Sequence, residues 1–154
     1  MLTFRPLTSK DETGREMYRL IESYYGDLDK IFIRRNGKFV PFSSLPMLDA
    51  FNVVKRIKYR RDSQPVEVVS RPLNIAIHSP LGMDCKKKSI FLSSYLRGNG
   101  IPYRLIASSK RADGRFHHVF PQCFLGSWHN LDATYSHNKP FQKKTITRAE
   151  VLSD

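Results

Sequence analysis

The sequence predicts an α+β fold in which a small antiparallel sheet packs against one buried helix. Apolar side chains recur at helical spacing between residues 17 and 24 and again between 90 and 96, which favours two helices. Asn36-Gly37 separates two β-prone runs and is the strongest short signal for a hairpin. Further β-prone runs follow within residues 102–131, divided by turn residues, and strands joined by short turns pair antiparallel.

An N-terminal helix and a hairpin are expected to precede the rest of the fold. Ser9–Glu12 fits a capping box, with serine as the N-cap and glutamate three residues later. Gly26 and the following aspartate are expected to end this helix. The hairpin then joins residues 31–35 to residues 38–40, because Asn36-Gly37 tolerates the positive φ that a type I′ turn needs at both central positions.

A second helix is expected after Pro46, since proline is favoured at the start of helices. The segment 61–81 contains three prolines and no sustained periodicity, so we expect a long loop with short ordered pieces. The apolar stripe of the second helix is expected to consist of Leu48, Phe51, Val54 and Ile57.

A buried helix is expected from Asp84 to Arg97, where Gly98-Asn99-Gly100 stops the helical pattern. Pro121 lies within a later β-prone run and predicts an edge position or a bulge, because proline cannot donate to a sheet ladder. The strands that follow the helix are expected at residues 102–107, 116–124 and 128–131.

Composition favours one compact intracellular domain. The chain has 154 residues, of which 40% are hydrophobic and 26% are charged, which is enough for a core. It shows no apolar run long enough for a transmembrane helix or a signal peptide, so we expect a cytoplasmic protein without a membrane partner. Two cysteines without a Cys-x-x-Cys pair predict neither a disulfide scaffold nor a zinc site, and no metal or organic cofactor is expected.

The chain is strongly basic, with a formal net charge of +12 and an isoelectric point near 10.0. Such a balance attracts polyanions or acidic protein surfaces. The densest basic segment is 55–61, which a solvated protein face explains more simply than a specific nucleic-acid site, because no recognition motif accompanies it.

Three residues form a candidate catalytic group. Cys85 lies where a loop becomes a helix, and the partial positive charge of a helix N-terminus favours a thiolate. Lys86–Lys88 add positive charge there, while Asp84 opposes them. His118 and Asp132 fall on adjacent predicted strands, which can place the two side chains together and near the helix start. This combination supplies a nucleophile, a base and a residue that orients the base.

Each of these residues also has an ordinary structural explanation. An isolated intracellular cysteine is usually a small buried apolar residue, and this remains our interpretation of Cys123. His117 and His118 are adjacent on a predicted strand, so only one of them can face Cys85. Asp132 could simply cap a turn.

Four motifs follow one another along the chain: the turn Gly82-Met83-Asp84-Cys85, the helix and joint Ser89–Tyr103, the strand His118-Val119-Phe120, and the ending Trp128–Thr134 with Asp132 inside it. In this order they resemble the transglutaminase-like branch of the papain-like thiol enzymes. The similarity covers residues 45–137, and residues 1–44 have no counterpart. Lys86–Lys88 depart from the acidic residues that often follow the cysteine in this family, which bears on substrate preference. Pro121 and Cys123 are also unusual in the histidine strand.

The resemblance implies a single domain, 1–154, with a papain/transglutaminase-like core at residues 45–137 and an added helix and hairpin in residues 1–44. It implies a cysteine protease, amidase or acyltransferase that acts on protein or peptide amides through Cys85, His118 and Asp132 and a thioester, with hydrolysis as the default. Short domains of this kind occur in bacteria and phages, so a virion location is compatible with it. The alternative is a non-catalytic interaction or virion-associated protein that binds an acidic partner or nucleic acid through its basic surface.

Overall fold

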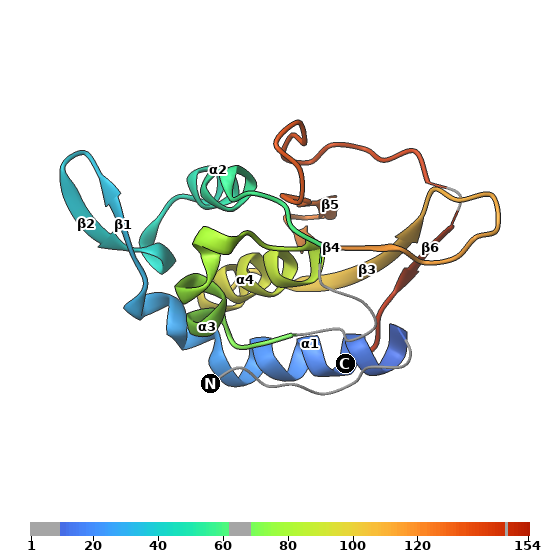
Figure 1. Ribbon diagram of the computed structural model, residues 1–154, viewed down its shortest axis with the longest axis horizontal. Helices are drawn as coiled ribbons and strands as arrows, with labels where there is room; N and C mark the ends of the chain where they lie inside the picture. Colours follow the sequence, from blue (N-terminus) through green and yellow to red (C-terminus); the bar gives the residue numbers. More distant parts are fainter. Residues whose placement is uncertain (1–9, 62–68, 147) are drawn as a thin grey trace.

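The computed structural model describes residues 10–61, 69–146 and 148–154, and it has an α+β fold with two antiparallel sheets. A central helix, α4 (Cys85–Gly98), contacts the helices around it and the four-stranded sheet. Figure 1 shows α1 below α4, α2 above it, and a two-stranded hairpin that projects from one end of the molecule. The α+β class and the antiparallel pairing expected from the sequence are confirmed.

The N-terminal helix α1 spans Lys10–Tyr24 and continues into the 3₁₀ turn η1, Tyr25–Lys30. Its fully buried side chains include Met17 and Ile21, which belong to the core cluster shared with α4. The expected N-cap, Ser9, lies outside the described residues. The helix therefore covers one side of α4 through the apolar spacing that predicted it.

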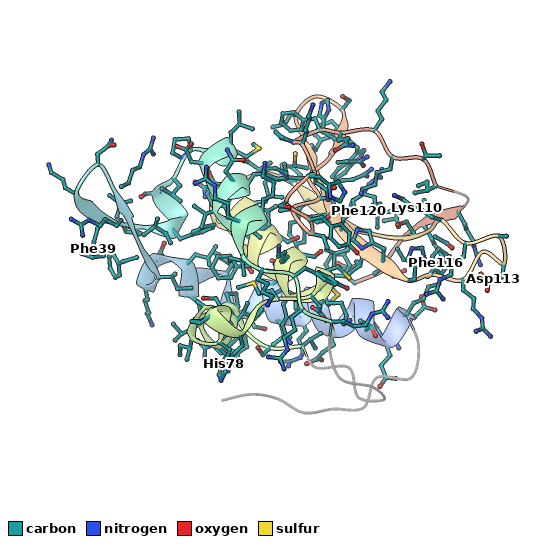
Figure 2. All side chains as sticks on the ribbon, turned by 45° about the horizontal axis from the view of Figure 1, so that its top comes forward. Phe39, His78, Lys110, Asp113, Phe116 and Phe120 are labelled. Carbon is teal, nitrogen blue, oxygen red and sulfur yellow. The ribbon has the colours of Figure 1, made fainter. Side chains whose placement is uncertain are left out.

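The hairpin consists of β1 (Phe32–Arg35) and β2 (Lys38–Pro41). Asn36 has φ 50° and Gly37 has φ 76°, so both central residues adopt the left-handed conformation that the turn requires. One face of the hairpin is exposed, with 71% of Phe39 accessible to solvent. Figure 2 shows Phe39 at the outer end of this projecting element.

The second helix, α2, spans Met47–Arg56, and Pro46 immediately precedes it as the N-cap residue. Its buried side chains are Ala50, Phe51 and Val54. Leu48, which we expected on the apolar stripe, is instead 48% exposed. The buried stripe passes through residues 47, 50, 51 and 54, and the side chain of residue 48 points about 100° away from the first of these.

The expected loop at residues 61–81 contains two short helical pieces where the structure describes it. They are α3 (Pro72–Ile77) and the 3₁₀ turn η3 (Ser79–Leu81), while residues 62–68 lie outside the description. The first turn of α3 is tied to η1, because Asp27 accepts hydrogen bonds from Leu73 N at 3.1 Å and from the Arg71 guanidinium. The described part of this segment therefore packs against η1 and α4.

The larger sheet has the order β5-β4-β3-β6, with every neighbouring pair antiparallel. The strand β6 was not expected from the sequence, because Arg148–Val151 alternates charged and small residues without an apolar run. No helix in the described part of the chain is long and apolar enough to cross a membrane. The strands are β3 (Tyr103–Ser109), β4 (His118–Phe124), β5 (Trp128–Asn130) and β6 (Arg148–Val151).

Pro121 lies in β4, which is an interior strand, so the expected edge position is wrong. In an antiparallel pair, a residue directs its N–H and its C=O toward the same neighbour. The carbonyl of Pro121 accepts from Leu131 N at 2.9 Å, so the missing N–H also faces the β5 side. The ladder of β5 ends at Asn130, and the short length of that strand is what permits a proline inside the sheet.

The hydroxyl of Tyr18 joins α1 to the sheet, and removing it tests this attachment. It accepts a hydrogen bond from Leu105 N at 2.8 Å, at a fully buried position just beyond the last residue that β6 pairs. We expect Tyr18→Phe to lower the free energy of unfolding by about 1–3 kcal/mol, because a buried N–H loses its acceptor. Urea unfolding curves would measure the change.

Tyr103 provides the matched control. Its ring packs on Tyr18 with the centroids 5.8 Å apart, and its buried hydroxyl has no hydrogen-bond partner among the described residues. Tyr103→Phe should therefore leave stability unchanged or slightly increased. Equal losses in the two variants would show that ring packing, and not the hydrogen bond to Leu105, joins α1 to the sheet.

Candidate active site

Cys85 is the first residue of α4 and is 8% exposed. Asp84 caps the helix by accepting a hydrogen bond from Lys87 N at 2.9 Å, and its other oxygen lies 3.0 Å from the Lys86 ammonium. The negative charge of Asp84, which would disfavour a thiolate at Cys85, is thus compensated by the N–H of Lys87 and the ammonium of Lys86. The sulfur remains at the end of the helix where the partial charge is positive.

A glycine fixes the turn that delivers Cys85 to this position. Gly82 has φ 95°, and a Cβ there would lie 2.8 Å from the carbonyl oxygen of Lys58. That approach arises because Met83 N donates to Lys58 O at 2.9 Å and Arg60 N donates to Met83 O at 3.0 Å. Both the conformation and the close contact require glycine. The turn is therefore locked to the segment that follows α2.

His118 and Asp132 meet at the end of the sheet. His118 begins β4, and its Nε2 lies 2.7 Å from Asp132 Oδ2, just after β5. The two side chains are 12% and 4% exposed. Because Nε2 is taken by the carboxylate, Nδ1 is the ring nitrogen left for the Cys85 thiol, whose hydrogen bond and charge both raise the pKa of His118.

The Asp132 carboxylate is held on both oxygens. Oδ1 accepts from Thr134 N at 3.0 Å and from Thr134 Oγ1 at 2.6 Å. Oδ2 is shared by His118 Nε2 and by the ammonium of Lys144, which lies 2.5 Å away. A carboxylate with four donors has one defined orientation, and it can orient the imidazole ring in turn.

The charges of this group stabilise one another. Burial alone would lower the pKa of His118, but the hydrogen bonds and charges of Asp132 and Cys85 raise it to about 9. Burial alone would raise the pKa of Asp132, yet His118 and Lys144 hold it well below its usual range. At neutral pH the histidine is therefore an imidazolium, which can donate a proton from Nδ1.

Aromatic rings flank the imidazole. Tyr135 stacks near His118 with centroids 6.2 Å apart and planes inclined by 19°, and His137 stacks on Tyr135 at 5.5 Å and 6°. Tyr59 packs against Tyr135 at 5.0 Å, and Phe120 lies beside His118 at 5.8 Å. Figure 2 shows Phe120 well inside the molecule, whereas Tyr135 is 39% exposed. The tyrosine side is thus the face of the histidine open to solvent.

Lys88, one turn after Cys85, is buried and ties three segments together. Its ammonium donates to the carbonyl oxygens of Ile57 at 2.6 Å, Thr134 at 2.8 Å and Ala133 at 3.2 Å. Burial lowers the pKa of Lys88 to about 8, although the negative charge of Asp132 acts to raise it. This lysine fixes the backbone of Thr134, and so fixes the residue that holds Asp132 Oδ1.

The structure brings Cys85, His118 and Asp132 together and separates the other candidates from them. Cys123 is fully buried in β4, and burial raises the pKa of its thiol. His117 is exposed and lies just before β4. Among the described residues, no group of three or more His, Cys, Asp and Glu side chains is arranged to hold a metal ion.

Sequence reasoning missed Lys144 and Tyr135 as parts of the site, and it counted Lys88 only as one of three cations near the thiol. Lys144 follows Asp132 by a segment without regular structure, so no periodicity links the two. Lys88 looks like an ordinary surface lysine on a helix, and only its 2% exposure distinguishes it. Thr134 was within the motif that carried the resemblance, and that motif was the only sequence signal that pointed to it.

Replacing Lys88 tests whether its buried ammonium is structural. Lys88→Met keeps the chain length but leaves the carbonyls of Ile57, Ala133 and Thr134 without their donor. We expect the free energy of unfolding to fall by about 2–4 kcal/mol, measured by urea unfolding. Lys58→Met, at a nearby exposed position, should stay within about 0.5 kcal/mol of wild type. Equal stability of both variants would contradict the structural role.

The His118–Asp132 pair also makes stability depend on pH. A histidine whose folded pKa is raised from 6.5 to about 9 stabilises the fold fully below pH 6.5, and this contribution is lost as pH rises through 9. We expect the free energy of unfolding of Cys85→Ala, in which no thiolate can form, to fall by about 1 kcal/mol between pH 6.5 and pH 8, because Asp132 still raises the pKa of His118. The lowered pKa of Lys88 acts with the opposite sign, mainly above pH 8.

Two further variants in the Cys85→Ala background isolate this effect in urea titrations at the two pH values. His118→Gln should abolish the decline, whereas His117→Gln, at the adjacent exposed position, should retain it. A Cys85→Ala protein equally stable at both pH values would show that the imidazolium does not stabilise the fold.

No protein-family model matches the chain, and no curated protein matches it. A similar solved structure is the crystal structure of a putative cysteine protease from Cytophaga hutchinsonii, with a TM-score of 0.47 and 14% sequence identity. The similarity covers 96% of this chain and 52% of that chain, so this chain spans about half the length of that protein. The roles of residues in this chain accordingly rest on its own geometry.

Proposed function

We propose that this chain is a cysteine enzyme that cleaves or transfers acyl groups at amide or peptide bonds through Cys85, His118 and Asp132. The observation that carries the proposal is a helix-start thiol beside an imidazole whose far nitrogen is held 2.7 Å from a buried carboxylate. Nucleophile, acid–base group and orienting group thus lie in the order that acyl transfer needs.

The reaction follows from the charges of the site. The Cys85 thiolate attacks the carbonyl carbon, and the C–N bond breaks as His118 Nδ1 gives its proton to the departing amine. A thioester on the sulfur remains. Water then attacks this thioester while Nδ1 accepts a proton from it, which releases the carboxylic acid and restores the thiolate–imidazolium pair. Throughout both steps, Asp132 keeps the ring in one orientation.

The developing oxyanion has a natural donor at the helix start. The first N–H groups of a helix have no intrahelical acceptor, and Cys85 is the first residue of α4. Its own N–H is therefore the candidate for stabilising the negative oxygen of the tetrahedral intermediate. Lys87 N is already bound to Asp84, which excludes it from this role.

The substrate class we propose is a peptide or protein amide. Tyr135 and Tyr59 form an aromatic wall next to the imidazole, and such a wall suits an extended peptide. Hydrolysis is the default outcome, because transamidation needs a second amine bound at the thioester. We assign the chain to a papain/transglutaminase-like arrangement, with residues 45–137 as the core and the N-terminal helix and hairpin as an addition.

Thiol reactivity tests this function without a known substrate. Cys85 is slightly exposed and Cys123 is fully buried, so a simple difference in labelling between them would report accessibility alone. The informative comparison is the rate of Cys85 alkylation by iodoacetamide at pH 6 in wild type, His118→Ala and His117→Ala. We expect His118→Ala to be slower by about tenfold, because the imidazolium that maintains the thiolate is lost.

His117→Ala, the matched control at the exposed neighbour, should react like wild type. Peptide mapping by mass spectrometry assigns each modified cysteine, and the same proteins in urea should all react at one rate. Equal rates for His118→Ala and wild type in the folded state would reject the catalytic pair. That result would favour a non-catalytic protein built on the same fold.

A further inference from the structure

A lysine beyond the motif residues reaches the site from the C-terminal segment. Lys144 lies in residues 142–146, which have no regular structure but are tied to β5. Asn130 O accepts from Phe141 N at 3.0 Å, and Asn130 Nδ2 donates to Gln142 O at 3.0 Å. These two bonds place the segment beside the end of the sheet and direct Lys144 toward Asp132.

The head group of Lys144 is enclosed by the site. Its side chain is 14% exposed, its ammonium lies 2.5 Å from Asp132 Oδ2, and it sits 4.9 Å from the centroid of Phe120. With Phe120 and Ile106, Lys144 lines a groove of about 300 Å³. Phe120 alternates with core-facing Val119, so this groove lies on the sheet face opposite the core. Lys144 therefore reaches the carboxylate from the side of the groove.

The charges that face Asp132 and His118 show what this contact supplies. Three cationic side chains act on Asp132: His118 in β4, Lys144 in the C-terminal segment, and Lys88 in α4, which interacts through its charge. Lys88 directs its ammonium to backbone carbonyls. His118 faces Asp132 and Cys85. Lys88 thus acts on Asp132 only through space, and Lys144 is the lysine in contact with this buried carboxylate, which is costly to leave without partners.

We propose that Lys144 is a positioning residue for the acyl-transfer reaction, holding the Asp132 carboxylate and balancing its charge. The inference rests on the proposed function, because it takes Asp132 to orient the catalytic imidazole. Lys144 acts through Asp132, whose Oδ2 it shares with His118. With this second ion-pair partner, Asp132 keeps both oxygens fixed when the imidazole gives up its proton.

The test compares Lys144→Met, Lys144→Arg and Lys143→Met in the full chain. Methionine keeps the length of the lysine and removes its charge, while arginine keeps the charge. Lys143 is the adjacent exposed lysine, so Lys143→Met matches the change in net charge. The first readout is the titration midpoint of the His118 imidazole by NMR. The second is the rate of Cys85 alkylation by iodoacetamide at pH 6.

We expect Lys144→Met to raise the His118 midpoint by about one pH unit, because Asp132 then attracts the imidazolium proton without competition. The same variant should not slow Cys85 alkylation at pH 6, because a more basic His118 retains the imidazolium that maintains the thiolate. Lys144→Arg should stay near wild type in both readouts, and Lys143→Met should change neither.

A purely structural lysine would lower stability and leave the His118 midpoint unchanged, and that result would overturn the proposal. Should Lys144→Met fail to fold, Lys144→Gln provides the same measurements, since its amide can still donate to Asp132 without the charge. The two proposals can fail separately. If Lys144→Met shifts the His118 midpoint but wild-type Cys85 is alkylated no faster than Cys85 in His118→Ala, the link from Lys144 to Asp132 stands and the acyl-transfer function is rejected.

Discussion

A carboxylate that is 4% exposed must be compensated by its surroundings, and the need to compensate Asp132 organises this end of the molecule. His118 comes to it from β4, Lys144 from the C-terminal segment, and Thr134 from two residues further along the chain. Each donor belongs to a different part of the chain, so the site forms only when the sheet is complete. The imidazolium at His118 is a consequence of this arrangement, because the same carboxylate that requires donors raises the pKa of the histidine to about 9.

The helix that carries Cys85 is joined to this charged group by a second buried cation. Lys88 lies one turn further along α4 and donates to the carbonyls of Ile57, Ala133 and Thr134. It therefore fixes the helix start relative to the residues that hold Asp132. Gly82 adds a third attachment, because its positive φ and close backbone contact lock the preceding turn to Lys58. The position of the helix start relative to the segment that carries Asp132 is thus determined by these contacts.

The sequence resemblance and the geometry make separate contributions to the functional proposal. The motifs around Cys85, His118 and Asp132 suggested a thiol enzyme, although the sequence alone could not place the three side chains together. The structure supplies the hydrogen bond between His118 and Asp132 and the enclosed position of the cysteine. Lys144 lies beyond the range of the resemblance, so it owes nothing to the motifs and follows from the geometry alone.

The sequence by itself determined the local features: the helix that Cys85 begins, the hairpin at Asn36-Gly37, and the order of the strands that carry His118 and Asp132. These depend on apolar periodicity, on turn residues and on helix stop signals, all of which act over a few residues. Only the tertiary structure decided the exposure of Leu48, the interior place of Pro121, the strand β6, and the burial of Lys88 and Lys144. Such features depend on contacts between segments far apart in the chain. Lys88 is buried because carbonyl groups distant in sequence accept from its ammonium, and Lys144 because a carboxylate distant in sequence pairs with it.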